Sequence, residues 1–356
     1  MSKTTPEHRR RGAQGLSRGA EAAFCADAWR TVSLQREVGV DWKTYYAREW
    51  TTPGAARQVA GWVAERPDEA LVGAVARGAI LSFPHTALRY AGALQASILR
   101  VLYGAGVRRV LALGVVHGGV VPAVRVAQDT AASPAERREA FNAASGGFLA
   151  APSAADTPLG RAPLWTVPDG SGLVRRTADG MLRDEFSLDS FLALSAAFAA
   201  NRGSDAIPVL PLYVGVTRDP ETGAFDVAER LAQWLRDVAR AGTAIVATGD
   251  LVHCGAHYGS PLSAFGCCDV GDAEPVLRRE VESVLVAALR GDLDLAYRLS
   301  TERLRSDQRE ILPVLAGVVG PRGACRLLHF SLSDYAPILD VPPPCCVASA
   351  LVQFDR

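Results

Sequence analysis

Several features that would indicate a nucleic-acid or membrane partner are missing from this 356-residue chain. Acidic and basic residues number 38 each, so the formal net charge is zero and no basic surface for a nucleic acid is indicated. No uninterrupted apolar run reaches the length of about 18 residues that a membrane-spanning helix needs. No apolar stretch follows the charged N-terminus, so a secretory signal is not indicated. We therefore predict no nucleic-acid partner and no membrane partner, and we expect a cytoplasmic protein.

The cysteines form none of the usual short motifs. There are seven of them, and no two are separated by two residues as in a zinc ribbon or a thioredoxin-like site. An odd number in a chain of this size fits reduced thiols in the cytoplasm better than a disulfide framework. Cys254 directly follows a histidine and could be a nucleophile, but a small buried residue is the better interpretation.

Apolar segments rich in β-branched residues alternate with helical patterns along the chain. We predict strands at residues 79–83, 110–116, 207–214 and 243–248. Pro208 and Pro211 are expected to place the third of these strands at an edge or at a bulge. Amphipathic spacing predicts helices over 93–103 and 225–241. The alternation predicts an α/β fold with three layers, α/β/α, around a mostly parallel central sheet.

Polar side chains stand at the ends of three predicted strands. His85 follows the first strand, His117 follows the second, and Asp250 and His253 follow the fourth. Ligands of parallel sheets gather beyond the carboxyl ends of the strands, and neighbouring glycines let a ligand approach closely. Taken singly, each histidine is better interpreted as a buried side chain bonded to the backbone. As a set, the three histidines make a metal site an equally good interpretation.

Six segments also share their order and spacing with the motifs of one family. They are residues 49–51, 79–85, 113–117, 184–189, 207–210 and 248–255. In this order they resemble the Memo-like family, which includes AmmeMemoRadiSam system protein B and is related to the class III extradiol dioxygenases. The resemblance implies a single domain over residues 46–356 and leaves residues 1–45 as a partly disordered N-terminal extension.

The resemblance also implies a set of metal ligands. In that family two histidines and usually a cysteine bind the metal, and the histidines correspond to His85 and His117. The position of the cysteine falls near Asp307, and no cysteine is present there. Two imidazoles and one carboxylate suit non-haem Fe(II), so Fe(II) is the expected metal, with copper and zinc as alternatives. Glu310 is a second candidate for the carboxylate, and loss of the metal site is the remaining interpretation.

Two further residues receive roles from the resemblance. His253 would lie beside the metal and move protons to or from a substrate. Asp250 could orient an imidazole by accepting its other N–H, or it could simply close a turn. The family motif E-H-S-x-E has Phe186 in place of its histidine and Asp189 in place of its second glutamate, which predicts a changed substrate. The acidic residues of this segment are otherwise explained as favourable charges at a helix N-terminus.

Three functions are compatible with these residues. The leading hypothesis is a non-haem Fe(II)-dependent oxygenase or dioxygenase that acts with O2 on a small phenolic or amine-bearing molecule. The alternative is a Memo-like accessory protein that binds metal without turnover and acts through a partner enzyme or as a homo-oligomer. A metal-dependent hydrolase, in which the same ligands activate water, is the weakest of the three.

Overall fold

The computed structural model describes residues 40–149, 156–167, 172–177, 181–202 and 206–356. Residues Asp41–Arg356 form one compact unit. This unit begins before the expected boundary at residue 46, because helix α2 (Trp42–Glu49) spans that boundary. Residues 1–39 of the expected N-terminal extension lie outside the described residues.

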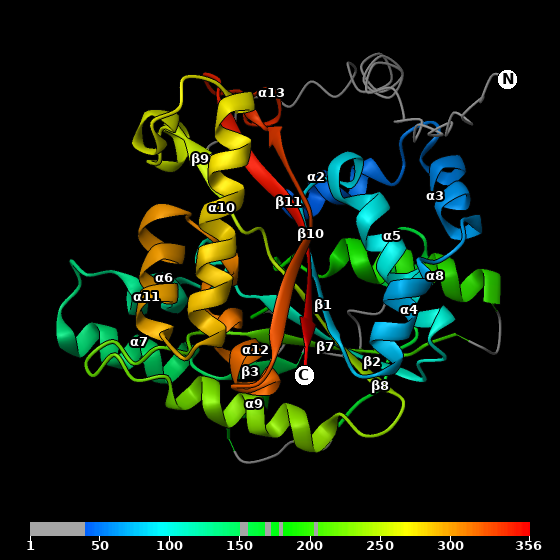
Figure 1. The fold of residues 1–356 in the computed structure, drawn as a ribbon, viewed down its shortest axis with the longest axis horizontal. Coiled ribbons are helices and arrows are strands. Elements are labelled where there is room, and N and C mark those ends of the chain that lie inside the picture. The colour runs from blue at the N-terminus through cyan, green and yellow to red at the C-terminus, as the bar shows by residue number, and fades with distance from the viewer. Residues whose placement is uncertain (1–39, 150–155, 168–171, 178–180, 203–205) are drawn as a thin grey trace, which may run out of the picture. The chain divides into compact units, whose positions relative to one another are not determined.

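A large mixed sheet runs through the middle of this unit (Figure 1). Its strands are β1 (Ile80–Phe83), β2 (Arg109–Val115), β3 (Gly147–Leu149), β6 (Val174–Arg176), β7 (Val209–Val214), β8 (Thr243–Thr248), β9 (His253–Gly255), β10 (Ala324–Asp334) and β11 (Cys345–Asp355). The strand order is β10-β11-β1-β8-β2-β7-β3-β6, and β9 pairs with β11. The four central strands, β1, β8, β2 and β7, are mutually parallel. Antiparallel pairs join β11 to β1 and β3 to β7 on either side of them.

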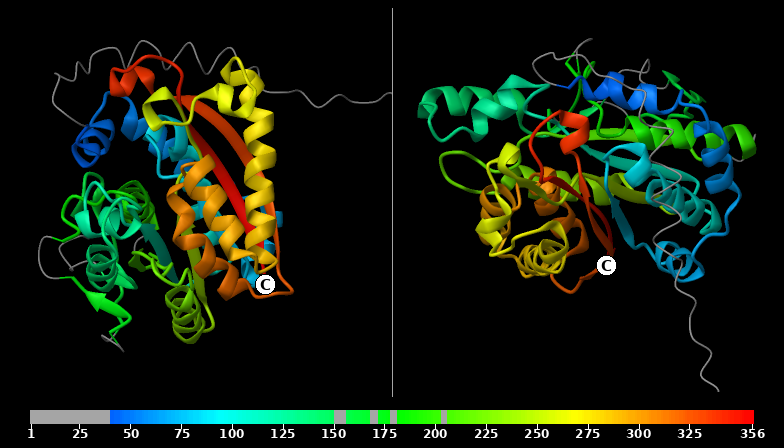
Figure 2. Two further views of the ribbon diagram at one scale, coloured as in Figure 1. Left: turned by 90° about the vertical axis from the view of Figure 1, so that its left-hand side faces the viewer. Right: turned by 90° about the horizontal axis from the view of Figure 1, so that it is seen from above.

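Helices cover both faces of the sheet. One layer contains α3 (Ala55–Ala64), α4 (Glu69–Ala76), α5 (Leu88–Gly104) and α8 (Asp189–Arg202). The other contains α9 (Asp226–Val238), α10 (Val270–Leu289), α11 (Leu293–Arg298) and α12 (Ile311–Val319). Figure 2 shows α10 lying along β10. The predicted α/β fold with helices flanking a central sheet is thus confirmed, and no helix of the described residues has the length and apolar character that a membrane span requires.

The alternation of side-chain direction along each strand explains why helices cover both faces of the sheet. Leu111 and Leu113 of β2 belong to a buried cluster that includes residues of α9, α10 and α12. Val110 and Ala112, which point to the opposite face, belong to a second cluster with residues of α5 and α8. Successive side chains of a strand point to opposite faces, so a strand that is apolar throughout needs a helical layer on each side.

The prediction that prolines would place the third strand at an edge or a bulge is wrong, because β7 lies between β2 and β3. The Val209 N–H donates to the carbonyl of Pro163, on the side of β7 away from β2. The nitrogen of Pro211, two residues on, points to the same side. Strand β3 pairs with β7 only from Leu212 onward. The missing N–H of Pro211 therefore removes no hydrogen bond from the sheet, which is why an inner strand tolerates it.

Candidate metal centre

The parallel strands bring their carboxyl ends to one edge of the sheet, where the polar residues gather. His85 follows β1, His117 follows β2, Asp250 follows β8, and His253 begins β9. Asp307 reaches the same place from a 3-10 turn, η6 (Asp307–Arg309), that precedes α12. The structure therefore brings together all five residues that the sequence singled out, although they come from four separate segments.

The carboxylate of Asp307 lies at the centre of this group. Its Oδ2 atom is 3.3 Å from Nε2 of His85, 3.7 Å from Nε2 of His117 and 3.6 Å from Nε2 of His253. An ion with ligand atoms about 2.1 Å away would hold neighbouring ligands about 3 Å apart. The ligand atoms of His85, His117 and Asp307 lie within 4.8 Å of one another, as do those of Asp250, His253 and Asp307. Either group could hold a metal ion.

Glu185 orients the imidazole of His117. This buried carboxylate accepts a hydrogen bond from Nδ1 of His117 at 2.9 Å and one from its backbone N–H at 2.8 Å. Because a carboxylate can only accept, Nδ1 carries the proton, and the lone pair of the neutral ring is left at Nε2, facing Asp307. The sequence suggested only helix capping for Glu185. The signal that could have pointed to it is its place in the segment 184–189, which resembles the E-H-S motif.

Charges within the centre shift the proton affinities strongly. Burial alone raises the pKa of Glu185, but the neighbouring His117 and backbone N–H donors outweigh burial and lower it to about 2. Burial alone lowers the pKa of His117, but the carboxylates of Glu185 and Asp307 raise it to about 10. Burial raises the pKa of Asp307, yet the charge of His253 and hydrogen bonds from His117 and His85 bring it well below its usual range. A metal ion at Nε2 of His117 would replace a proton there.

The other two imidazoles are held differently. Nδ1 of His253 donates to the carbonyl oxygen of Arg305 at 2.8 Å, so its Nε2 also presents a lone pair. Nδ1 of His85 has no hydrogen-bond partner among the described residues, whereas its backbone N–H donates to Oδ1 of Asp250 at 3.2 Å. Asp250 thus holds the main chain of His85, and its Oδ2 lies 3.7 Å from Nε2 of the same residue. Among the described residues, no hydrogen bond from an imidazole N–H to Asp250 shows the orienting role suggested for it. Glu185 and the Arg305 carbonyl orient the imidazoles of His117 and His253 in this way.

Aromatic rings cover the imidazoles. Phe186 stacks on the ring of His117, with centroids 4.3 Å apart, and meets the ring of His85 edge-on at 5.9 Å. From α2, Trp42 and Tyr46 pack against Phe186 at centroid distances of 6.4 and 5.5 Å. His85 is only 3% exposed. Phe186, Trp42 and Tyr46 therefore give this wall of the centre an apolar, aromatic character.

Two other sequence candidates lie away from the centre. Glu310 is buried and accepts hydrogen bonds from the backbone N–H of Thr217 at 2.7 Å, from Tyr297 Oη at 2.6 Å and from Gln128 Nε2 at 2.8 Å. Its carboxylate is thus occupied elsewhere, and the structure directs Asp307 rather than Glu310 to the histidines. Cys254 is fully buried opposite Cys346 of β11, as expected for a packed side chain. The six cysteines among the described residues are all free thiols.

Comparisons with known proteins leave the family open. No family model matches this chain, and no curated protein matches it. Among solved structures, it is similar to the crystal structure of an uncharacterized protein from Escherichia coli K12. That likeness has a TM-score of 0.39 and 12% sequence identity, and it covers 78% of this chain and 99% of the other. At this TM-score the likeness supports no argument, so the resemblance to the Memo-like family stays a prediction.

Proposed function

We propose that this chain is a non-haem Fe(II)-dependent oxygenase or dioxygenase, with His85, His117 and Asp307 as the metal ligands. The observation that supports this most is the position of Asp307 Oδ2, within 3.7 Å of both Nε2 atoms. Two imidazoles and one carboxylate on the same side of an ion leave its remaining positions open, as non-haem Fe(II) oxygenases require. When bound, Fe(II) would supply a binding position for O2 next to a chelating substrate.

His253 would then act as the acid/base residue. Its Nδ1–H is held by the carbonyl of Arg305, so the lone pair of Nε2 is directed into the centre. A neutral imidazole in this tautomer can accept a proton from a substrate hydroxyl or amine and return it later. The nearby ring of Tyr258, with its centroid 4.9 Å from that of His253, limits the orientations that the imidazole can adopt.

The aromatic wall bears on the substrate. A planar substrate ring could pack near Phe186, which already stacks on His117, because aromatic rings pack favourably in stacked or edge-on arrangements. We therefore place small phenolic or amine-bearing molecules first, with catechols and aminophenols as the initial choices and O2 as co-substrate. The reduced thiols agree with a cytoplasmic location, which is part of this proposal.

Metal analysis is the first test. The chain would be reconstituted with Fe(II) under anaerobic conditions, beside the variants His85→Ala, His117→Ala and Asp307→Ala. His329→Ala is the matched control, since His329 is exposed on β10. We expect near-stoichiometric iron in the wild type and the control, and loss of iron in the three ligand variants. Wild-type protein that retains no iron would refute the proposal.

Turnover is tested separately. Oxygen uptake by the iron-loaded protein would be followed with catechols and aminophenols, and His253→Gln should keep iron while losing uptake. The alternative function is a metal-binding accessory protein without turnover. The burial of His85 and the packing of α2 over Phe186 favour it, since they narrow the approach to the metal. Stoichiometric iron without oxygen uptake on any of these compounds would support that alternative.

A further inference from the structure

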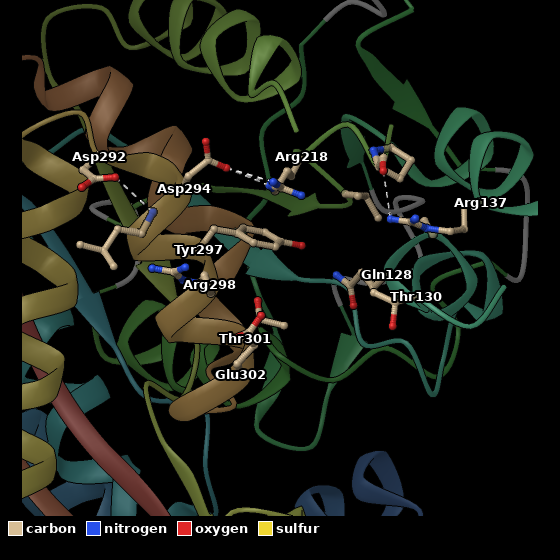
Figure 3. A pocket seen from close by; sticks show the side chains of 14 residues that line it. Gln128, Thr130, Arg137, Arg218, Asp292, Asp294, Tyr297, Arg298, Thr301 and Glu302 are labelled. Atoms are coloured by element: carbon tan, nitrogen blue, oxygen red, sulfur yellow. Dashed lines mark hydrogen bonds and ion pairs between the residues drawn. The ribbon is translucent and has the colours of Figure 1, made fainter. Parts of the chain in front are cut away.

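A cavity away from the metal centre is lined entirely by residues that do not belong to that centre. It has a volume of about 560 Å³, which is in the range of small-molecule sites (Figure 3). One wall comes from α11 and the turn after it, with Asp292, Asp294 and Arg298. The opposite wall comes from α7 (Pro134–Ala144) and the segment before it, with Arg137 (Figure 3). Arg218, from the loop after β7, extends between the two walls.

The three arginines keep N–H groups that the described protein does not use. Arg298 is exposed, and its guanidinium group has no hydrogen bond or ion pair with any described residue. Arg137 donates one hydrogen bond, from Nη2 to the carbonyl of Pro220 at 3.0 Å. Arg218 donates from Nε and Nη2 to Oδ1 of Asp294, at 3.3 and 3.0 Å. Nη1 of Arg137 and Nη1 of Arg218 thus stay available to a ligand.

The acidic residues of the cavity likewise keep free acceptors. Asp294 uses only Oδ1 for Arg218. Asp292 uses Oδ1 to accept from the backbone N–H of Leu295 at 3.2 Å. Their Oδ2 atoms bond to nothing among the described residues. Glu302 is exposed at the same cavity. Three carboxylates and three guanidinium groups therefore line the cavity, and their formal charges cancel.

This balance of charge selects one kind of ligand. An anion attracted to the arginines would be repelled by the carboxylates in the same cavity. A cation attracted to the carboxylates would be repelled by the arginines. A molecule with one charge of each sign gains from both. In Figure 3 the carboxylates of Asp292 and Asp294 lie on the wall opposite Arg137. Arg298 lies on the same wall as these carboxylates, and Arg218 pairs with Asp294 at 3.0 Å, so charges of both signs are present within the one cavity. A small zwitterion can therefore interact with charges of both signs in this cavity.

The walls are also held in place before any ligand binds. Tyr297, which lines the cavity, donates its hydroxyl proton to Glu310 Oε1 at 2.6 Å. Gln128, on the other side, donates to the same oxygen at 2.8 Å. Arg218 lies over the ring of Tyr297, 5.5 Å from its centroid. A site whose side chains are already fixed loses little conformational entropy on binding, which favours affinity.

We infer that this cavity is a binding site for a small zwitterion of the α-amino-acid or dipeptide class. The ligand carboxylate is held by Nη1 of Arg137 and Nη1 of Arg218. The ligand ammonium group is held by the free oxygens of Asp292 and Asp294. This inference goes beyond the proposed oxygenase function and does not depend on it, since no residue of the metal centre lines the cavity.

Calorimetric titration of the full-length chain tests the ligand class. The probes are L-alanine and L-alanyl-L-alanine, with propionate and ethylamine as matched compounds that each lack one charge. We expect saturable binding of at least one zwitterion, and binding of both single-charge compounds at least tenfold weaker. Absence of binding by both zwitterions would overturn the inference. So would propionate that binds as tightly as alanine, because the cavity would then be an anion site.

Two variants test the location. Asp292→Asn keeps the oxygen that caps α11 and removes only the charge, so the unfolding temperature should not change. Arg137→Gln removes a positive charge from the opposite wall. Each should raise the dissociation constant of the bound zwitterion at least tenfold. Arg230→Gln, at an exposed position on α9, is the control and should bind as the wild type does. Unchanged binding by Asp292→Asn would overturn the assignment of this cavity.

Discussion

Replacing Glu185 with glutamine tests how the metal centre is organised. The two carboxylate oxygens accept four hydrogen bonds and donate none. Oε1 accepts from His117 Nδ1 and from the backbone N–H groups of Phe186 and Ser187, each at 2.9 Å. Oε2 accepts from the backbone N–H of His117 at 2.8 Å. Glutamine offers one oxygen and one NH2 group, so it cannot accept from every donor.

The cost can be estimated from either orientation of the new amide. If the NH2 takes the position of Oε2, it faces the backbone N–H of His117, and two donors are left without acceptors. Each buried donor without a partner costs about 1–3 kcal/mol, so a loss of at least about 2 kcal/mol is expected. If the NH2 takes the position of Oε1, it favours the tautomer of His117 that has its proton on Nε2. In that tautomer the lone pair is on Nδ1, facing the amide, and Nε2 has none to offer a metal. Loss of such a supporting residue lowers metal affinity about 10- to 100-fold.

Two measurements on Glu185→Gln separate these effects. Denaturant unfolding of the metal-free protein gives the change in the free energy of unfolding. Titration with Fe(II) under anaerobic conditions, in competition with a chelator, gives the change in metal affinity. Asp189→Asn is the matched control, because Asp189 is a neighbouring acid that pairs with Lys43 at 3.1 Å. The side chain of Lys43 is 40% exposed, so this ion pair is partly open to solvent. The control should leave metal affinity unchanged.

One result would refute the reasoning about His117. If Glu185→Gln binds Fe(II) within about twofold of the wild type, the Nδ1–H to Glu185 bond does not prepare His117 as a ligand. A loss of stability with unchanged metal affinity would give Glu185 a purely structural role. Equal losses of metal affinity in Glu185→Gln and Asp189→Asn would mean that general electrostatics, and not the tautomer of His117, sets the affinity.

Three other changes have expected outcomes that the structure defines. Gly249→Ala should lower the free energy of unfolding by about 1–3 kcal/mol and weaken iron retention. The reason is that φ is +150° at this position and a Cβ would collide with Gln308, next to Asp307. Denaturant unfolding and metal analysis would check the two effects. Burial raises the pKa of Glu49 to about 7, so the folded chain holds a proton that the unfolded chain loses above pH of about 4.5. The free energy of unfolding should therefore fall as the pH rises from 4.5 to 7, and Glu49→Gln should remove up to about 3 kcal/mol of that fall. Wild-type and Glu49→Gln stability profiles that run parallel over this pH range would contradict the prediction. Tyr297→Phe removes the hydroxyl that donates to a buried carboxylate, so urea unfolding should show a loss of about 1–3 kcal/mol.

The sequence by itself determined the class of fold and the strand ends on which the centre is built. The apolar runs at 79–83 and 243–248 correspond to β1 and β8, and the amphipathic segment 225–241 contains α9. These features are local, because the direction of a side chain along a strand or a helix follows from the period of that element. The same locality places His85 and His117 directly after strands, where ligands of parallel sheets gather.

Only the tertiary structure decided which of these residues meet. Asp307 and Glu310 are three positions apart, and no local pattern says that one faces the histidines while the other faces Tyr297. Their directions follow from the 3-10 turn before α12, whose place is set by packing against distant segments. The role of Glu185 has the same origin, since its partner His117 lies 68 residues earlier in the chain. Contacts between residues so far apart in the chain depend on the order of the strands in the sheet. That order is set by how the helices from distant parts of the chain cover both faces of the sheet.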